Sequence, residues 1–140
     1  MMARAYLKFS ILAFVTYSLV APLLKVAMET IPSTPAVFFS NFVLLVVVGG
    51  VLVYRGESPV PYLRHRYTLH IVGLGVLLTV GLLTYYRALE LGPVSIVVPI
   101  YGLFIVVSSV IGIVAFDETL TARKIAGIFF SVLAIVLVSI

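Results

Sequence analysis

Three ionisable side chains lie inside long apolar runs of the sequence: Lys25, Arg87 and Glu90. At the centre of a membrane helix such a group costs at least about 2.5 to 3.5 kcal/mol, so its presence requires an explanation. All three lie within one or two turns of a predicted helix end, where a long side chain can reach water. Two hypotheses follow. Either the three groups only anchor helix ends, or Lys25 lines an outer vestibule in which it pairs with Glu90 or contacts an anionic solute.

Uncharged polar residues cost less to bury, because a hydrogen bond between helices, worth about 0.6 kcal/mol, offsets part of the cost. Asn41 either faces a cavity or takes part in such packing, and the sequence leaves both possibilities open. Tyr101 is the better cavity candidate among the tyrosines, since Pro99 and Gly102 loosen the helix around it and free backbone carbonyls for a ligand. The predicted solute-contacting residues are Tyr17, Ser18, Lys25, Asn41, Tyr85, Glu90, Tyr101 and Ser108.

Two short spacings refine this set. Tyr85 and Tyr86 are adjacent on one predicted helix, so they cannot both face inward. They either line a pocket or belong to the aromatic belt at the membrane surface. Ser108 and Gly112 are four residues apart, which places two small residues on one helix face, where another helix can approach closely.

Signatures of catalysis and of metal binding are missing from the sequence. It has no cysteine, which excludes disulfides, thiolate metal ligands and cysteine nucleophiles. It also has no His-Glu-x-x-His motif, no phosphate-binding glycine loop and no pair of carboxylates within an apolar run. Glu118 is predicted to order a turn and to pair with Arg123 and Lys124. We therefore predict a protein that is not an enzyme and has no cofactor and no metal site.

The elements that must position these residues are membrane-spanning helices. Hydrophobic residues make up 63% of the 140 positions and charged ones 10%, against about 25% charge in a typical soluble domain. The apolar residues form long runs without the alternation of barrel strands, and lipid then allows only helices. The first run follows Arg4 and Lys8 and lacks a small-residue cleavage site, so we expect it to be retained and not removed as a signal peptide.

We therefore predict an all-α, polytopic transmembrane helix bundle that forms a single domain over residues 1–140. The first span is predicted to bend near Pro22, because proline removes a backbone hydrogen bond. The five expected spans cover about residues 7–28, 36–54, 68–91, 94–116 and 122–140.

Lysine and arginine are unequally divided between the two predicted faces of the membrane. The face of the N-terminus holds Arg4, Lys8, Arg55, Arg64, Arg66, Arg123 and Lys124, and the opposite face only Lys25 and Arg87. Cytoplasmic loops are enriched in these residues, so we predict a cytoplasmic N-terminus and an outer C-terminus. The net charge of +4 is then explained by charges beside an anionic leaflet, and no nucleic-acid partner is expected.

Two junctions between predicted spans have a distinctive sequence. In residues 85–99, YYRALELGPVSIVVP, a Tyr-x-x-Ala-Leu segment leads into a small-residue turn, and residues 117–127, DETLTARKIAG, precede the last predicted helix. Both segments resemble those of the EamA domain family of the drug/metabolite transporter (DMT) superfamily. The first span, with Tyr17-Ser18 and the residues PLLK at 22–25, resembles the opening helix. The sequence departs from the family at Tyr17, where many members have tryptophan, at Asn41, where many have arginine, and at Ile105, where proline is frequent.

The resemblance implies a small secondary transporter or exporter that moves a metabolite or amphipathic solute across the cytoplasmic membrane by alternating access. Most EamA transporters resemble two fused five-helix units, and this chain is one EamA-like unit. With an odd number of spans, a second unit joined in tandem inserts upside down and gives the inverted repeats on which many transporters rock. We therefore expect an oligomer, either a homodimer or a pair with a paralogous five-helix subunit. The alternative is a non-transporting membrane assembly module or partner subunit.

Overall fold

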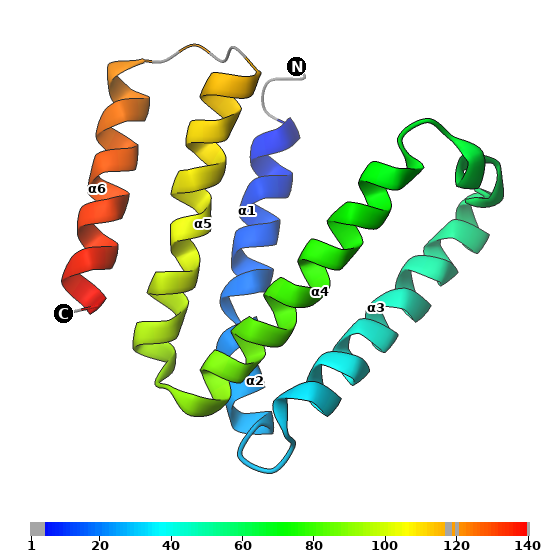
Figure 1. Cartoon of the computed structure of the whole chain (residues 1–140), viewed down its shortest axis with the longest axis horizontal. Helices are drawn as coiled ribbons and strands as arrows, with labels where there is room; N and C mark the ends of the chain where they lie inside the picture. Colours follow the sequence, from blue (N-terminus) through cyan, green and yellow to red (C-terminus); the bar gives the residue numbers. More distant parts are fainter. Residues whose placement is uncertain (1–4, 117–118, 120, 140) are drawn as a thin grey trace. The chain divides into compact units, whose positions relative to one another are not determined.

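The computed structural model of the chain describes residues 5–116, 119 and 121–139. The predicted roles of Arg4 and Glu118 therefore lie outside the described residues, as does the end of the last expected span at residue 140. Every regular element in the described part of the chain is helical, which confirms the predicted all-α class. The elements are α1 (Ala5–Ser18), α2 (Val20–Ala27), α3 (Ser33–Arg55), the 3-10 helix η2 (Val60–Arg64), α4 (Thr68–Leu91), α5 (Val94–Ala115) and α6 (Ala122–Ser139) (Figure 1).

Four helical stretches are long and apolar enough to cross a membrane: Tyr6–Ala27, which joins α1 and α2, Ser33–Arg55, Thr68–Leu91 and Val94–Ala115. α6 has 18 residues, and a rise of about 1.5 Å per residue gives it a length of about 27 Å. That length is close to the hydrocarbon thickness of about 30 Å. The fifth span therefore stays a prediction.

The first predicted span is interrupted at Leu19, between α1 and α2. The ring of Pro22 clashes with the carbonyl four residues earlier, at Ser18, and proline has no N–H to donate to it. At the interruption the N–H of Leu19 donates to the Thr16 carbonyl at 3.4 Å, three residues back and not the four of an α-helix. The helix is thus interrupted about one turn before Pro22, and the predicted bend itself stays a prediction.

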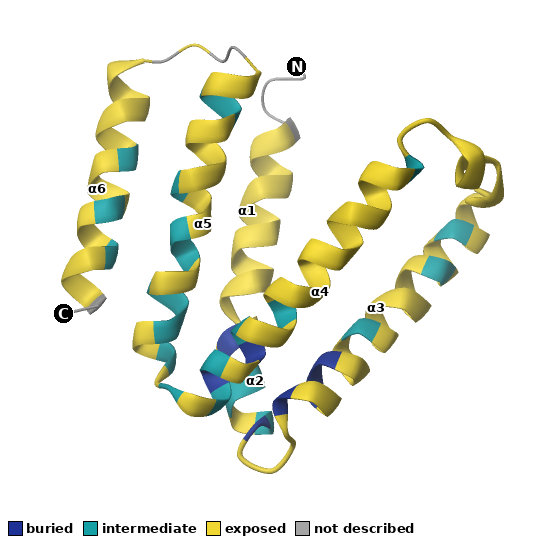
Figure 2. Cartoon of the chain, viewed as in Figure 1, coloured by how far each residue is buried: buried dark blue, intermediate teal, exposed yellow. Residues whose placement is uncertain are grey.

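The chain divides into two compact units, Met1–Leu91 and Gly92–Ile140. In unit 1, α3 and α4 pack as a helical hairpin, and α2 packs against the C-terminal end of α4. Its buried residues gather where α2, the start of α3 and the end of α4 meet (Figure 2). They are Ala21, Met28, Ser33, Ala36, Val37, Tyr86 and Leu89.

Unit 2 consists of α5 and α6 packed against each other. None of its described residues is buried. Most described residues of both units are exposed (Figure 2), and many of them have large apolar side chains. In water such a surface is unstable, whereas in a bilayer it faces acyl chains that are as apolar as leucine. The two units therefore have the surface of membrane helices. Among the described residues, a buried core occurs only at the end of unit 1 where α2, the start of α3 and the end of α4 meet, which we call the converging end.

Candidate functional site

Lys25 is bonded to another helix at the converging end of unit 1. Its Nζ donates a hydrogen bond to the carbonyl of Leu89 at 2.6 Å, and Leu89 is 0% exposed. The last carbonyls of a helix have no partner within the helix and carry the negative end of its dipole. Lys25 on α2 therefore caps the C-terminus of α4 with a cation, which holds the two helices together.

The two other ionisable residues pair with each other one turn apart on α4. Arg87 Nη1 lies 2.9 Å from Glu90 Oε2. Glu90 is partly buried, and Ser33 at the start of α3 lies beside its carboxylate. Each of the three ionisable residues thus has a partner within unit 1, which supports the hypothesis that they anchor helix ends.

Tyr86 is buried at this end of unit 1, whereas Tyr85 is half-buried, and its predicted contact with solute stays a prediction. Its hydroxyl lies 3.1 Å from the hydroxyl of Ser40 on α3, in a hydrogen bond between helices. The two tyrosine rings meet edge to face at 6.2 Å. Sequence reasoning established that only one of the pair can face inward, but it did not single out Tyr86 or Ser40 as partners.

Three predicted solute-contacting residues of unit 1 do not converge on a site. The Asn41 side chain donates to the Val37 carbonyl of its own helix at 2.8 Å. The Ser18 hydroxyl donates to the Val15 carbonyl, also in its own helix, at 2.7 Å. Tyr17 is 75% exposed. These side chains serve their own helices or face outward, and unit 1 does not bring them together.

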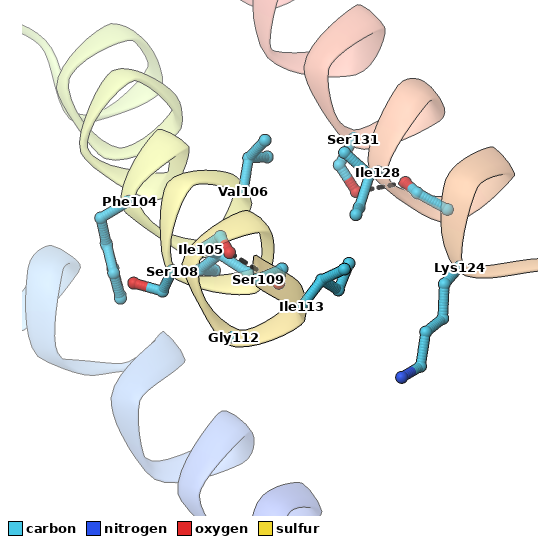
Figure 3. Close-up of a pocket in the computed structure, with 11 residues that line it drawn as sticks. Phe104, Ile105, Val106, Ser108, Ser109, Gly112, Ile113, Lys124, Ile128 and Ser131 are labelled. Atoms are coloured by element: carbon cyan, nitrogen blue, oxygen red, sulfur yellow. Dashed lines mark hydrogen bonds between the residues drawn. The ribbon is translucent and has the colours of Figure 1, made fainter. Parts of the chain in front are cut away.

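Unit 2 contains a groove between α5 and α6 with a volume of about 620 Å³ (Figure 3). This volume lies within the range of about 300 to 1,000 Å³ that is typical of small-molecule sites. The groove has apolar walls, small residues and hydroxyl groups, and Lys124 stands at the first turn of α6. Its lining consists of Phe104, Ile105, Val106, Ser108, Ser109, Gly112, Ile113, Lys124, Gly127, Ile128 and Ser131.

Two hydroxyls of the groove form hydrogen bonds within their own helices, as Figure 3 shows. Ser109 donates to the Ile105 carbonyl and Ser131 to the Gly127 carbonyl, each at 2.8 Å. A hydroxyl that donates to its own helix keeps lone pairs with which it can accept a hydrogen bond from a ligand. The groove can therefore hold an amphipathic molecule, with its apolar part against the walls and its polar part on the serines.

Two of the predicted residues belong to unit 2. Ser108 lines the groove. Tyr101 is 44% exposed, and its ring packs against Phe104, which lines the groove, at 5.0 Å. α5 runs through Pro99 as one helix, and the expectation that Pro99 and Gly102 loosen the helix near Tyr101 and free carbonyls for a ligand stays a prediction. Pro99 lies near the start of α5, and the loss of one backbone donor there does not end the helix.

Sequence reasoning missed the α6 side of this groove. Gly127 and Ser131 are four residues apart on α6, the same spacing of small residues as Ser108 and Gly112 on α5. Two such pairs on consecutive predicted helices indicate that the two helices can approach closely at these positions and leave space for a ligand beside the contact. No group of three or more metal-binding side chains occurs among the described residues.

The chain was compared with known proteins in three ways. The family model described as the EamA-like transporter family matches residues 4–140, nearly the whole chain. Neither the curated proteins nor the solved structures gave a match.

Proposed function

The chain belongs to the EamA-like transporter family, and from that premise we propose that it carries a metabolite or amphipathic solute across the cytoplasmic membrane as a small secondary transporter. It is a polytopic membrane protein of the DMT superfamily, and family members are transporters and not enzymes. Beyond membership of the family, we propose the class of solute, the binding site and the mechanism. Solute binds by shape and hydrogen bonds, and no covalent bond is made or broken.

The α5–α6 groove is the observation that supports this proposal. It is the hollow in which hydroxyl groups, small residues and apolar walls occur together at the size of a small molecule. A second hollow between the same helices has only apolar lining residues, such as Val114 and Phe129, and suits lipid or a neighbouring helix. We therefore assign the solute to the first groove, with Ser108, Ser109 and Ser131 as its polar contacts.

We further propose that the transporting form is an oligomer, with a homodimer or a paralogous five-helix subunit as the two candidates. The described chain has one small buried core, in unit 1, and none in unit 2. A paralogous subunit of opposite orientation would complete the inverted pair on which many transporters rock. A homodimer would be parallel, because every copy carries the same lysine and arginine asymmetry. We also propose a cytoplasmic N-terminus and an outer C-terminus, which the distribution of lysine and arginine supports.

A flux screen in proteoliposomes tests the transport proposal. Purified, folded protein is reconstituted and offered a panel of amines, amino acids, sugars and amphipathic metabolites. We expect saturable flux of at least one solute, absent from protein-free vesicles. Folded protein that moves no member of the panel, with or without an ion gradient, contradicts the proposal.

A non-transporting membrane module is the second candidate. The cross-helix bonds of Lys25 and Tyr86 support it, because they hold the helices of unit 1 in one arrangement. In that case the α5–α6 groove seats a helix of a partner protein and not a solute. A partner helix excludes water from the groove, which is the property that separates the two candidates.

A further inference from the structure

The segment that joins α3 to α4, residues 56–67, is folded and attached to α4 by hydrogen bonds. Gly56 ends α3 with a φ of 66°, in the left-handed region that favours glycine. After η2, the hydroxyl of Thr68 at the start of α4 donates to the Tyr62 carbonyl at 2.7 Å. The N–H of Thr68 donates to the His65 carbonyl at 3.0 Å. The side chains of this segment are therefore held at one end of the α3–α4 hairpin.

Apolar and aromatic side chains of this segment face away from the protein. Tyr62 and Leu63 are each 67% exposed, and Val60 and Tyr67 are exposed as well. The segment connects two helices with the length and composition of membrane spans, so it lies at a membrane surface. Aromatic and apolar side chains are stabilised there, between the headgroups and the acyl chains.

Arginine side chains accompany these apolar groups. The one acidic residue of the segment, Glu57, lies 3.9 Å from Arg55 at the end of α3. Arg64 and Arg66 have no carboxylate partner among the described residues. The Arg66 guanidinium lies 5.9 Å from the centre of the Tyr67 ring. A guanidinium donates two parallel hydrogen bonds to a phosphate group, so both side chains are suited to an anion at this surface.

We propose that residues 56–67 form a binding site for anionic phospholipid headgroups. Arg64 and Arg66 contact the lipid phosphates, while Tyr62 and Leu63 lie among the upper parts of the acyl chains. A neutral membrane offers the segment the same apolar contacts without a net negative charge to attract the arginines. The proposal goes beyond solute transport and does not depend on it, because these residues belong to unit 1 and not to the α5–α6 groove.

Lipid-selective fluorescence quenching tests the site in the full chain. The sequence has no tryptophan, so Tyr62→Trp provides a single emitter at the segment. The protein is reconstituted in mixtures of phosphatidylcholine and phosphatidylglycerol in which one or the other carries brominated acyl chains. We expect stronger quenching by the anionic lipid at equal mole fraction. That preference should fall about five-fold for each arginine removed, as in Arg64→Gln and Arg66→Gln.

A charge-matched control separates a local site from the overall charge of the protein. Lys8→Gln with Arg123→Gln removes two exposed charges from the same predicted face, outside the segment, and should leave the preference unchanged. Equal quenching by both lipids in the Tyr62→Trp protein would overturn the proposal, as would the absence of quenching by either lipid. A preference that survives Arg64→Gln with Arg66→Gln, or that falls equally in the control, would also overturn it.

Discussion

At the converging end of unit 1, Lys25, Ser40 and Tyr86 bond from one helix to another, whereas in unit 2 Ser109 on α5 and Ser131 on α6 bond within their own helices. Lys25 reaches Leu89 and Ser40 reaches Tyr86, so α2 and α3 are each tied to α4. Ser109 and Ser131 donate to carbonyls of the turn before them. Bonds between helices fix one packing arrangement, while bonds within a helix leave its faces available to a solute.

The two regions therefore differ in their expected roles: unit 1 holds its helices together, and the groove of unit 2 is the proposed solute site. The buried side chains of the described chain lie in unit 1, around the cross-helix bonds, and the small-molecule groove lies in unit 2. Substitutions in the first region should therefore change stability, and substitutions in the second should change transport. The following predictions test that separation, from the largest expected effect to the smallest.

Lys25→Met should destabilise the protein most. The substitution keeps a similar length but leaves the carbonyl of the buried Leu89 without its cation, and a hydrogen bond to a charged group is worth about 1.5 to 3 kcal/mol. We expect a lower midpoint of thermal unfolding, followed by circular dichroism in detergent. Lys8→Met, which removes an exposed lysine from α1, is the matched control. An equal fall in both variants would contradict the capping role of Lys25.

Gly127→Leu should reduce transport without reducing stability. Gly127 lines the groove, and an added Cβ there has no neighbouring atom within 4 Å, so the helix tolerates a side chain that then occupies the solute space. Excess volume in a packed site costs about 1 to 3 kcal/mol, which corresponds to solute binding that is weaker by about five-fold to about 150-fold. The measurement is concentration-dependent uptake into proteoliposomes of the solute found in the flux screen.

Gly75→Leu on α4 is the control for this experiment, because its added Cβ also meets open space but lies outside the groove. It should transport like the parent protein. If Gly127→Leu also transports like the parent, the solute does not bind between α5 and α6.

Tyr86→Phe should have the smallest effect. It removes the hydroxyl that bonds to Ser40 and keeps the buried ring, and bonds between membrane helices average about 0.6 kcal/mol. We expect a small fall in the unfolding midpoint and unchanged transport. Tyr85→Phe should change neither, so an equal fall in both variants would show that the Ser40 contact adds no stability.

Much of the helical framework could be predicted from the sequence, because the length of an apolar run and the positions of Pro22 and Gly56 are local properties. The partners of polar residues could not be predicted in the same way. Asn41 and Ser18 each have a carbonyl of their own helix three or four residues back within reach, and the sequence does not say whether a side chain bonds there or across to another helix. The bond from Lys25 to Leu89 joins residues 64 positions apart, which no local pattern specifies.

The residues of the α5–α6 groove could likewise be predicted only in part from the sequence. Ser108 was predicted from its own helix, but its companions Gly127 and Ser131 required the pairing of α5 with α6. The α6 side could be recognised once the two four-residue spacings were set beside each other. The volume between them depends on how far apart the helices pack, and that is a tertiary property.

Water access to the groove tests the central claim most directly, that the space between α5 and α6 is a solute site. The sequence has no cysteine, so single cysteines can be introduced and labelled in membranes with a small polar thiol reagent. Ser131→Cys introduces a cysteine into the groove. Phe130→Cys is the control, because it lies only about 1.5 Å from position 131 along the helix axis but replaces an exposed side chain outside the groove. We predict labelling at position 131, slowed by transported solute, and little labelling at position 130. Equal labelling at both positions, or none at 131, would contradict the claim.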